Sequence, residues 1–226
     1  MSVIKPFQAY VYNPIKITDM AKVVCPPYDV ISPEQEIVLQ KRSPYNFIHM
    51  MLAKADAKQT EDDKRYEKAG AMFQKWVKDE VLVQDKKPCI YYTKQEYKIL
   101  GQKQSRMGFF AAMKIEDEKA RIFPHEKTHA GAKEDRFRLW SALQAACSPI
   151  FVCFSDKQKK VETTFQRSVS LAKPYIDVVD DEGTRNRSGV WKIRSRSGRS
   201  WRPSITRTCS SRTGITVMRC PGVTAK

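Results

Sequence analysis

Apolar and polar residues recur along the first part of the chain in patterns that predict helices. At residues 61–78, apolar positions recur at helical spacing among charged residues, which predicts an amphipathic helix. The apolar stripe, and therefore the expected buried face, consists of Tyr66, Ala69, Met72, Phe73, Trp76 and Val77. Ser32, Pro33 and Gln35 have the spacing of a capping box with proline at the first helical position, so a helix begins there. A third helix is predicted at residues 133–146.

Strand patterns lie between these helices. Residues 89–97 and 107–115 are rich in aromatic and β-branched residues, and the polar GQKQSR between them indicates a hairpin turn. Residues 148–154 read as a buried strand, and shorter strands are expected at residues 23–24 and 191–193. The pattern predicts an α+β fold in which a mixed sheet is flanked by helices, as one domain or the front part of a larger one.

The pattern ends near Ile193. The following segment, RSRSGRSWRPSITRTCSSRTGITVMRCPGVTAK, has neither a helical nor an alternating apolar period. Residues 183–226 contain nine Arg, two Lys and no acidic residue, so they carry +11 of the net charge of +16. We therefore predict a folded part at residues 1–193 and a basic, disordered tail at residues 194–226.

Three interpretations of the tail remain open at this point. A basic arm can neutralise the phosphates of a nucleic acid, but Trp201, Ile205 and Cys209 are among several apolar residues and thiols that solvated arms avoid. A solvated tail without function is the second interpretation, and a shifted reading of the gene is the third. Residues 1–182 carry a net charge of only +5, so we expect no nucleic-acid partner.

Composition indicates the class of protein. No apolar run approaches the roughly 18 residues that span a bilayer, and the first ten residues lack the apolar stretch of a signal peptide. The six cysteines show no C-x-x-C spacing, so neither a disulfide framework nor a structural zinc site is expected. A cytoplasmic protein that does not enter a membrane is the expectation.

Residues 124–136, PHEKTHAGAKEDR, are the densest group of chemically active side chains. His125, Glu126 and His129 satisfy the H-E-x-x-H pattern of a zinc hydrolase, in which one helix presents both imidazoles. Pro124 and Gly131 instead favour a loop, and no third ligand with suitable spacing is present, so we assign no metal to this motif.

The same segment fits an anion site better. Lys133 supplies charge and Arg136 supplies a planar fork for phosphate oxygens. Glu126 or Asp135 can then act as a base or hold Mg²⁺, and His125 is a further candidate catalytic residue. The alternative is an ion-paired turn that caps a helix without further function.

A second candidate segment is PPYDVIS at residues 26–32. Two prolines stiffen the backbone and present Tyr28 as a binding residue and Asp29 as a candidate catalytic carboxylate. The alternative is that Asp29 caps the turn and Tyr28 packs. Asn46, in SPYNFI, can bond either to a ligand or to the backbone.

Five blocks of the chain, in this order, resemble the family called domain of unknown function 1015 (DUF1015). The blocks are KPFQAYVYNP at 5–14, VVCPPYDVISPEQ at 23–35, SPYNFI at 43–48, PHEKTHAGAKEDR at 124–136 and SPIFVCFSD at 148–156. The resemblance implies a longer protein, with an ADGHHRY motif shortly after a strand like Trp191 to Ile193. Here the basic tail stands in that place.

The resemblance also implies a function for full-length relatives. The DGHHR-type motif is similar to the phosphate-binding motif of the superfamily that includes ParB, sulfiredoxin and free serine kinases. Full-length relatives would therefore bind ATP or ADP with Mg²⁺ and transfer a phosphoryl group to a small hydroxyl substrate such as serine. This chain, if incomplete, would be inactive.

The genetic code allows the missing motif to be hidden in the tail. Joining the third base of each codon to the first two of the next lets TCSSRTGITVMR, at residues 208–219, be read as LFIADGHHRYE. We therefore expect a frameshift near Arg194 and a premature stop.

Overall fold

A computed structural model of the chain describes residues 4–52, 62–113, 127–154, 156–169, 173–191 and 215–219. The chain divides into two compact units. We call Met1–Ala9, Asp85–Glu126 and Pro149–Lys226 the sheet unit, and Tyr10–Gln84 and Lys127–Ser148 the helical unit. The boundary expected between residues 193 and 194 stays a prediction.

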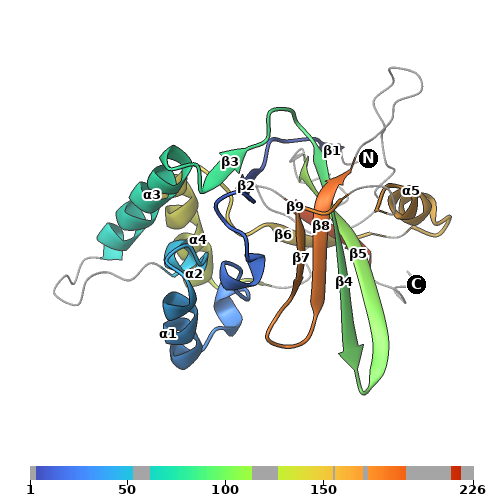
Figure 1. The fold of residues 1–226 in the computed structure, drawn as a ribbon, viewed down its shortest axis with the longest axis horizontal. Helices are drawn as coiled ribbons and strands as arrows, with labels where there is room; N and C mark the ends of the chain where they lie inside the picture. Colours follow the sequence, from blue (N-terminus) through green and yellow to red (C-terminus); the bar gives the residue numbers. More distant parts are fainter. Residues whose placement is uncertain are drawn as a thin grey trace. The chain divides into compact units, whose positions relative to one another are not determined.

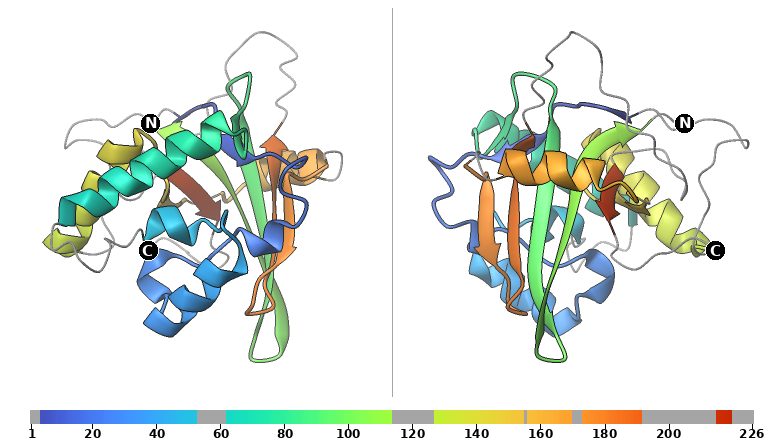
Figure 2. Two further views of the ribbon diagram at one scale, coloured as in Figure 1. Left: turned by 60° about the vertical axis from the view of Figure 1, so that its left-hand side comes forward. Right: turned by 90° about the vertical axis from the view of Figure 1, so that its right-hand side faces the viewer.

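The sheet unit is built on a seven-stranded mixed sheet and one described helix, α5 (Lys160–Val169). The strands are β1 (Ile4–Lys5), β4 (Ile90–Ile99), β5 (Gln102–Met113), β6 (Ile150–Cys153), β7 (Ile176–Val179), β8 (Arg185–Trp191) and β9 (Ile215–Arg219). Their order is β6-β9-β5-β4-β8-β7, with β1 also paired to β5. Only β6 and β9 are parallel among the described pairs, and α5 crosses one face of the sheet (Figures 1 and 2). The predicted α+β class with a mixed sheet is confirmed.

The hairpin of β4 and β5 turns more tightly than its sequence suggested. Leu100 and Gly101 form a two-residue turn with φ of 48° and 79°, the left-handed conformation that matches the twist of paired strands. The polar segment GQKQSR is therefore mostly strand, not loop. Its residues Gln102 to Gln104 lie at the end of the hairpin where β8 no longer pairs with β4, so polar side chains are tolerated there.

The sheet unit has an aromatic core beneath α5. Tyr92, Phe109, Phe165 and Trp191 are all at most 3% exposed. Phe109 and Phe165 stack with ring centroids 5.8 Å apart, and Phe165 lies 4.5 Å from the ring of Trp191. Burial of these large aromatic side chains supplies most of the free energy that holds α5 against the sheet.

The helical unit surrounds a second core. Its elements are β2 (Tyr10–Tyr12), the 3-10 turns η1 (Met20–Lys22) and η2 (Tyr28–Val30), α1 (Pro33–Arg42), α2 (Ile48–Met51), α3 (Asp62–Lys78), β3 (Leu82–Gln84) and α4 (Ala130–Leu143). Strands β2 and β3 pair antiparallel. None of the helices in the described part of the chain is both long and apolar enough to cross a membrane.

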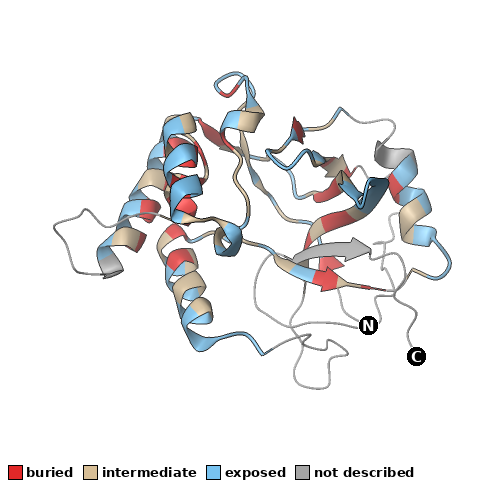
Figure 3. Ribbon diagram, turned by 90° about the horizontal axis from the view of Figure 1, so that it is seen from below, coloured by how far each residue is buried: buried red, intermediate tan, exposed pale blue. Residues whose placement is uncertain are grey.

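Two predicted helices are confirmed in detail. The Ser32 hydroxyl accepts from the Gln35 backbone N–H, and the Gln35 side chain accepts from the Ser32 N–H, which completes the capping box of α1. Along α3, buried positions recur at helical spacing between exposed ones (Figure 3). The buried apolar side chains of the stripe are Tyr66, Ala69, Phe73 and Trp76, which pack with Leu139 and Leu143 of α4, whereas Met72 and Val77 are only partly buried.

Other expectations differ from the structure. Helix α4 begins at Ala130, three residues earlier than predicted, and ends before Gln144, whose φ of 53° stops the helix. Only Val152 of β6 is buried, because this strand lies at the end of the sheet order and Phe151 is 41% exposed. Val23 caps η1 instead of forming a strand.

The expected disordered tail also needs correction at five residues. Ile215–Arg219 form β9, which pairs with both β5 and β6. β-branched Ile215, Thr216 and Val217 suit an extended backbone. The remainder of segment 194–226 lies outside the described residues, as do Lys192 and Ile193 of the predicted last strand.

The close approach of α3 and α4 gives a testable prediction. A Cβ added at Gly70 would lie 2.7 Å from the backbone oxygen of Ala142, so Gly70→Ala should lower the free energy of unfolding by about 1–3 kcal/mol. Gly131→Ala, in α4 with no atom within 4 Å of the added Cβ, is the matched control and should be neutral or slightly stabilising. Urea unfolding measures both; equal stability of the two variants would contradict the packing.

Candidate functional site

Two of the predicted binding residues meet in the helical unit. The guanidinium carbon of Arg136, on α4, lies 4.1 Å from the ring centroid of Tyr28, which opens η2. Pro27 precedes Tyr28 with a φ of −56°, and the half-buried ring packs against Arg136. A cation over the face of an aromatic ring is attracted to it, and the contact fixes the plane of the guanidinium group.

The guanidinium group that packs on Tyr28 also donates hydrogen bonds to Asp135. The Arg136 Nε donates to Asp135 Oδ2 at 2.7 Å, and its Nη2 also donates to that oxygen. The other carboxylate oxygen accepts from Arg65 Nη2 at 2.6 Å and from the Tyr66 hydroxyl at 2.8 Å. One carboxylate therefore bonds to two guanidinium groups.

Arg136 retains one hydrogen-bond donor without an acceptor. Its side chain is only 13% exposed, and Nη2 makes a further, long contact of 3.4 Å with the Met51 carbonyl oxygen. Its Nη1 is buried and has no hydrogen-bond partner among the residues that the structure describes. Because leaving a buried donor without an acceptor costs about 1–3 kcal/mol, this atom is a natural contact for an oxygen of a bound anion.

The environment of the cluster shifts the pKa values of Asp135 and Tyr66. Burial opposes ionisation of Asp135, but hydrogen bonds from Arg136 and Tyr66 and the charges of both arginines outweigh it and lower the pKa of that carboxyl. Burial, followed by the hydrogen bond to Asp135, raises the pKa of the Tyr66 hydroxyl. At neutral pH the cluster is thus an ionised carboxylate between two cations, with Tyr66 as a neutral donor.

Asp29 and Lys133 lie near these residues in sequence and are exposed. Asp29 follows Tyr28 in η2, and its side chain makes no hydrogen bond or ion pair with the described residues. Lys133 is one helical turn before Arg136 and borders a shallow surface hollow with Thr128, His129 and Phe137. Both side chains are accessible to a ligand, and their predicted roles stay predictions.

Asn46 bonds to the backbone, one of the two alternatives left open by its sequence. The side chain is fully buried, and its Nδ2 donates to the carbonyl oxygens of Lys22 and Val24 at 2.8 and 3.1 Å. Its Oδ1 accepts from the Ile48 N–H at 3.0 Å. Asn46 therefore fixes the segment that leads into the Tyr28 loop.

The predicted catalytic pair, His125 and Glu126, lies outside the described residues. His129 is described, and it precedes α4 with an extended backbone at φ −59° and ψ 142°. His129 is thus not inside a helix, whereas the zinc interpretation of H-E-x-x-H requires both histidines to lie on one helix. In the described part of the chain, no group of three His, Cys, Asp or Glu residues could hold a metal.

The role of Asp135 can be tested by removing its charge. Asp135→Asn should lower the free energy of unfolding by about 1–3 kcal/mol at pH 7, because two guanidinium groups lose their shared partner. The folded pKa of Asp135 is depressed, so its contribution is complete above the unfolded value of about 3.9 and is lost as pH falls toward the folded pKa. The difference from the parent should therefore shrink at acidic pH.

Glu134→Gln is the matched control for this experiment. It removes the adjacent carboxylate, which is 58% exposed and paired with Arg138, and should change the free energy of unfolding by no more than about 0.5 kcal/mol. Urea unfolding at several pH values measures both variants. A pH-independent difference for Asp135→Asn would contradict the electrostatic origin.

Comparison with known proteins places the chain in one family. Residues 4–198 match the family described as protein of unknown function (DUF1015). No curated protein and no solved structure matches the chain. The match includes the proline loop with Tyr28 as well as α4 with Asp135 and Arg136, and it extends over most of the sequence. The chain therefore belongs to the DUF1015 family.

Proposed function

We propose that the cluster around Arg136 binds a phosphate group of a nucleotide, and that the protein descends from nucleotide-dependent phosphotransferases. The observation that carries the proposal is the buried Nη1 of Arg136, which has no acceptor among the described residues. Arg136 shares Asp135 with Arg65, and this leaves the Nη1 of Arg136 without an acceptor. A guanidinium fork suits phosphate because two donors can engage two oxygens.

The neighbouring residues have distinct roles in this proposal. The Tyr28 ring keeps the guanidinium in one plane, and Lys133 adds a second charge toward the phosphates of ATP or ADP. Asp29 accepts a proton from the acceptor hydroxyl, and its carboxylate can hold Mg²⁺. Serine is the acceptor that the resemblance implies. Phosphoryl transfer relies mainly on positioning and on neutralising charge.

We also propose that the segment after Arg194 is read out of the family's frame. Three observations support this. Acidic residues vanish after Glu182, the family match ends at residue 198, and residues 208–219 permit the string LFIADGHHRYE in the neighbouring frame. Without that phosphate-binding string, this chain would bind a nucleotide weakly and would not transfer its phosphoryl group.

Nucleotide binding can be measured directly with Mg²⁺-ATP and Mg²⁺-ADP by calorimetry. Arg136→Lys keeps the charge but loses the fork and the stacked plane, so its Kd should rise about tenfold. Arg138→Lys, two residues later and 44% exposed, is the matched control and should leave the Kd unchanged. Equal affinity of the two variants, or no binding by the parent chain, would overturn the assignment of Arg136.

The frame proposal predicts the result of resequencing the encoding DNA from the codon of Arg187 onward. We expect a single-base slip whose correction opens a frame with LFIADGHHRYE. The frame-corrected protein should form phosphoserine from ATP and serine, seen by phosphorus NMR, and the present chain should not. An intact frame throughout, or equal activity of the two products, would refute it.

A further inference from the structure

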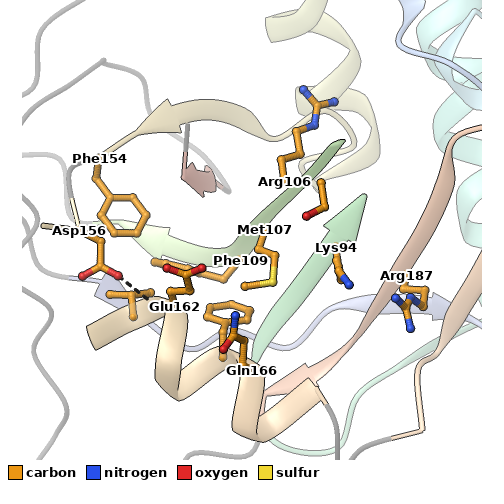
Figure 4. Close-up of a pocket in the computed structure, with 13 residues that line it drawn as sticks. Lys94, Arg106, Met107, Phe109, Phe154, Asp156, Glu162, Gln166 and Arg187 are labelled. Atoms are coloured by element: carbon orange, nitrogen blue, oxygen red, sulfur yellow. Dashed lines mark hydrogen bonds between the residues drawn. The ribbon is translucent and has the colours of Figure 1, made fainter. Parts of the chain in front are cut away.

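The sheet unit contains a pocket that the proposed function does not use. It has a volume of about 360 Å³ and lies between α5 and the adjacent face of β4, β5 and β8 (Figure 4). This volume is in the lower part of the range for small-molecule sites. Every residue that lines it belongs to the described part of the sheet unit.

The floor of the pocket is apolar and aromatic. Phe109 and Phe165 stack with an interplanar angle of 29°, and Phe154 meets Phe109 edge to face with centroids 6.0 Å apart. Met107 lies beside them and its side chain points into the pocket (Figure 4). Such a floor suits a flat, apolar body of a ligand.

One end of the pocket is basic. Lys94 and Arg187 are direct partners across β4 and β8, so their side chains emerge on the same face of the sheet. Lys94 Nζ and Arg187 Nη2 each lie 2.7 Å from an oxygen of Glu96. Two cations again share one carboxylate, and Arg187 Nε is buried with no hydrogen-bond partner among the described residues. Arg106 adds nothing here, because its side chain points away (Figure 4).

Asp156, at the other end of the pocket, has less influence on a ligand. Both oxygens of Asp156 accept backbone N–H groups of α5, from Lys160 and Glu162, at 3.0 Å. Asp156 therefore caps the helix, and its charge is balanced by the positive N-terminal end of the helix dipole. The excess charge at the Lys94 end then decides which ligand fits.

We propose that this pocket binds a small organic anion with a flat apolar body. The body lies on Phe109 and Phe165, and a carboxylate or phosphate group accepts hydrogen bonds from Lys94 and Arg187. The site goes beyond the nucleotide function proposed for the helical unit and shares no residue with it.

Anilinonaphthalene sulfonate, a fluorescent aromatic anion, is the probe for the test with the full chain. Its Kd should rise about tenfold in Gln166→Trp, which fills the pocket from α5, and about tenfold in Lys94→Met, which removes the charge. Thr163→Trp on the same helix and Lys98→Met on the same strand are matched controls outside the pocket. Both controls should bind the probe as the parent does.

Competition then identifies the anionic group. Naphthoate and naphthyl phosphate should displace the probe, the stronger of the two showing which group is preferred, and uncharged naphthalene methanol should be at least about tenfold weaker. Equal binding by all four variants, or equal competition by the uncharged compound, would overturn the proposal. The two pocket variants alter opposite sides of the site, so if circular dichroism shows that one is unfolded, the other decides.

Discussion

The shared carboxylate of Asp135 is the interaction on which the helical unit's polar site depends. Asp135 lies on α4 and accepts hydrogen bonds from Arg65 and Tyr66 of α3, so it joins two helices whose apolar faces already pack together. It also restrains Arg136, which follows it directly. Packing brings the helices close, and this ion-paired network fixes where the guanidinium group points. Without the network, the contact with Tyr28 would compete with solvation of a mobile side chain.

In the sheet unit, strand register is what positions the basic side chains. The tight turn at Gly101 sets the pairing of β4 with β5, and the pairing of β4 with β8 then places Lys94 opposite Arg187. A shift of β8 by one residue relative to β4 would move Arg187 to the other face of the sheet, away from Lys94. In both units, therefore, two basic side chains converge on one acidic side chain, Asp135 or Glu96, and a donor stays without a partner among the described residues.

The sequence predicted the features that depend only on residues close together in the chain. The capping box of Ser32 and the stripe of α3 depend on neighbours within a few residues. The sequence also indicated Arg136 as an anion ligand. It gave no signal that Arg65, which lies 70 positions earlier, would share Asp135, because that pairing depends on how α3 and α4 pack. The turn at residues 100–101 was missed because its leucine is unusual at a positive φ.

The position of β9 has a consequence for how the sheet unit forms during translation. Strands β5 and β6 are both made before residue 154, yet neither pairs with the other, since β9 lies between them. While the ribosome is still making the intervening 61 residues from 154 to 214, both strands expose backbone donors and acceptors. Until β9 is made, Met107 to Ala111 of β5 lack a partner on one edge and β6 has no partner in the sheet, so a strand from another chain can pair with that edge first.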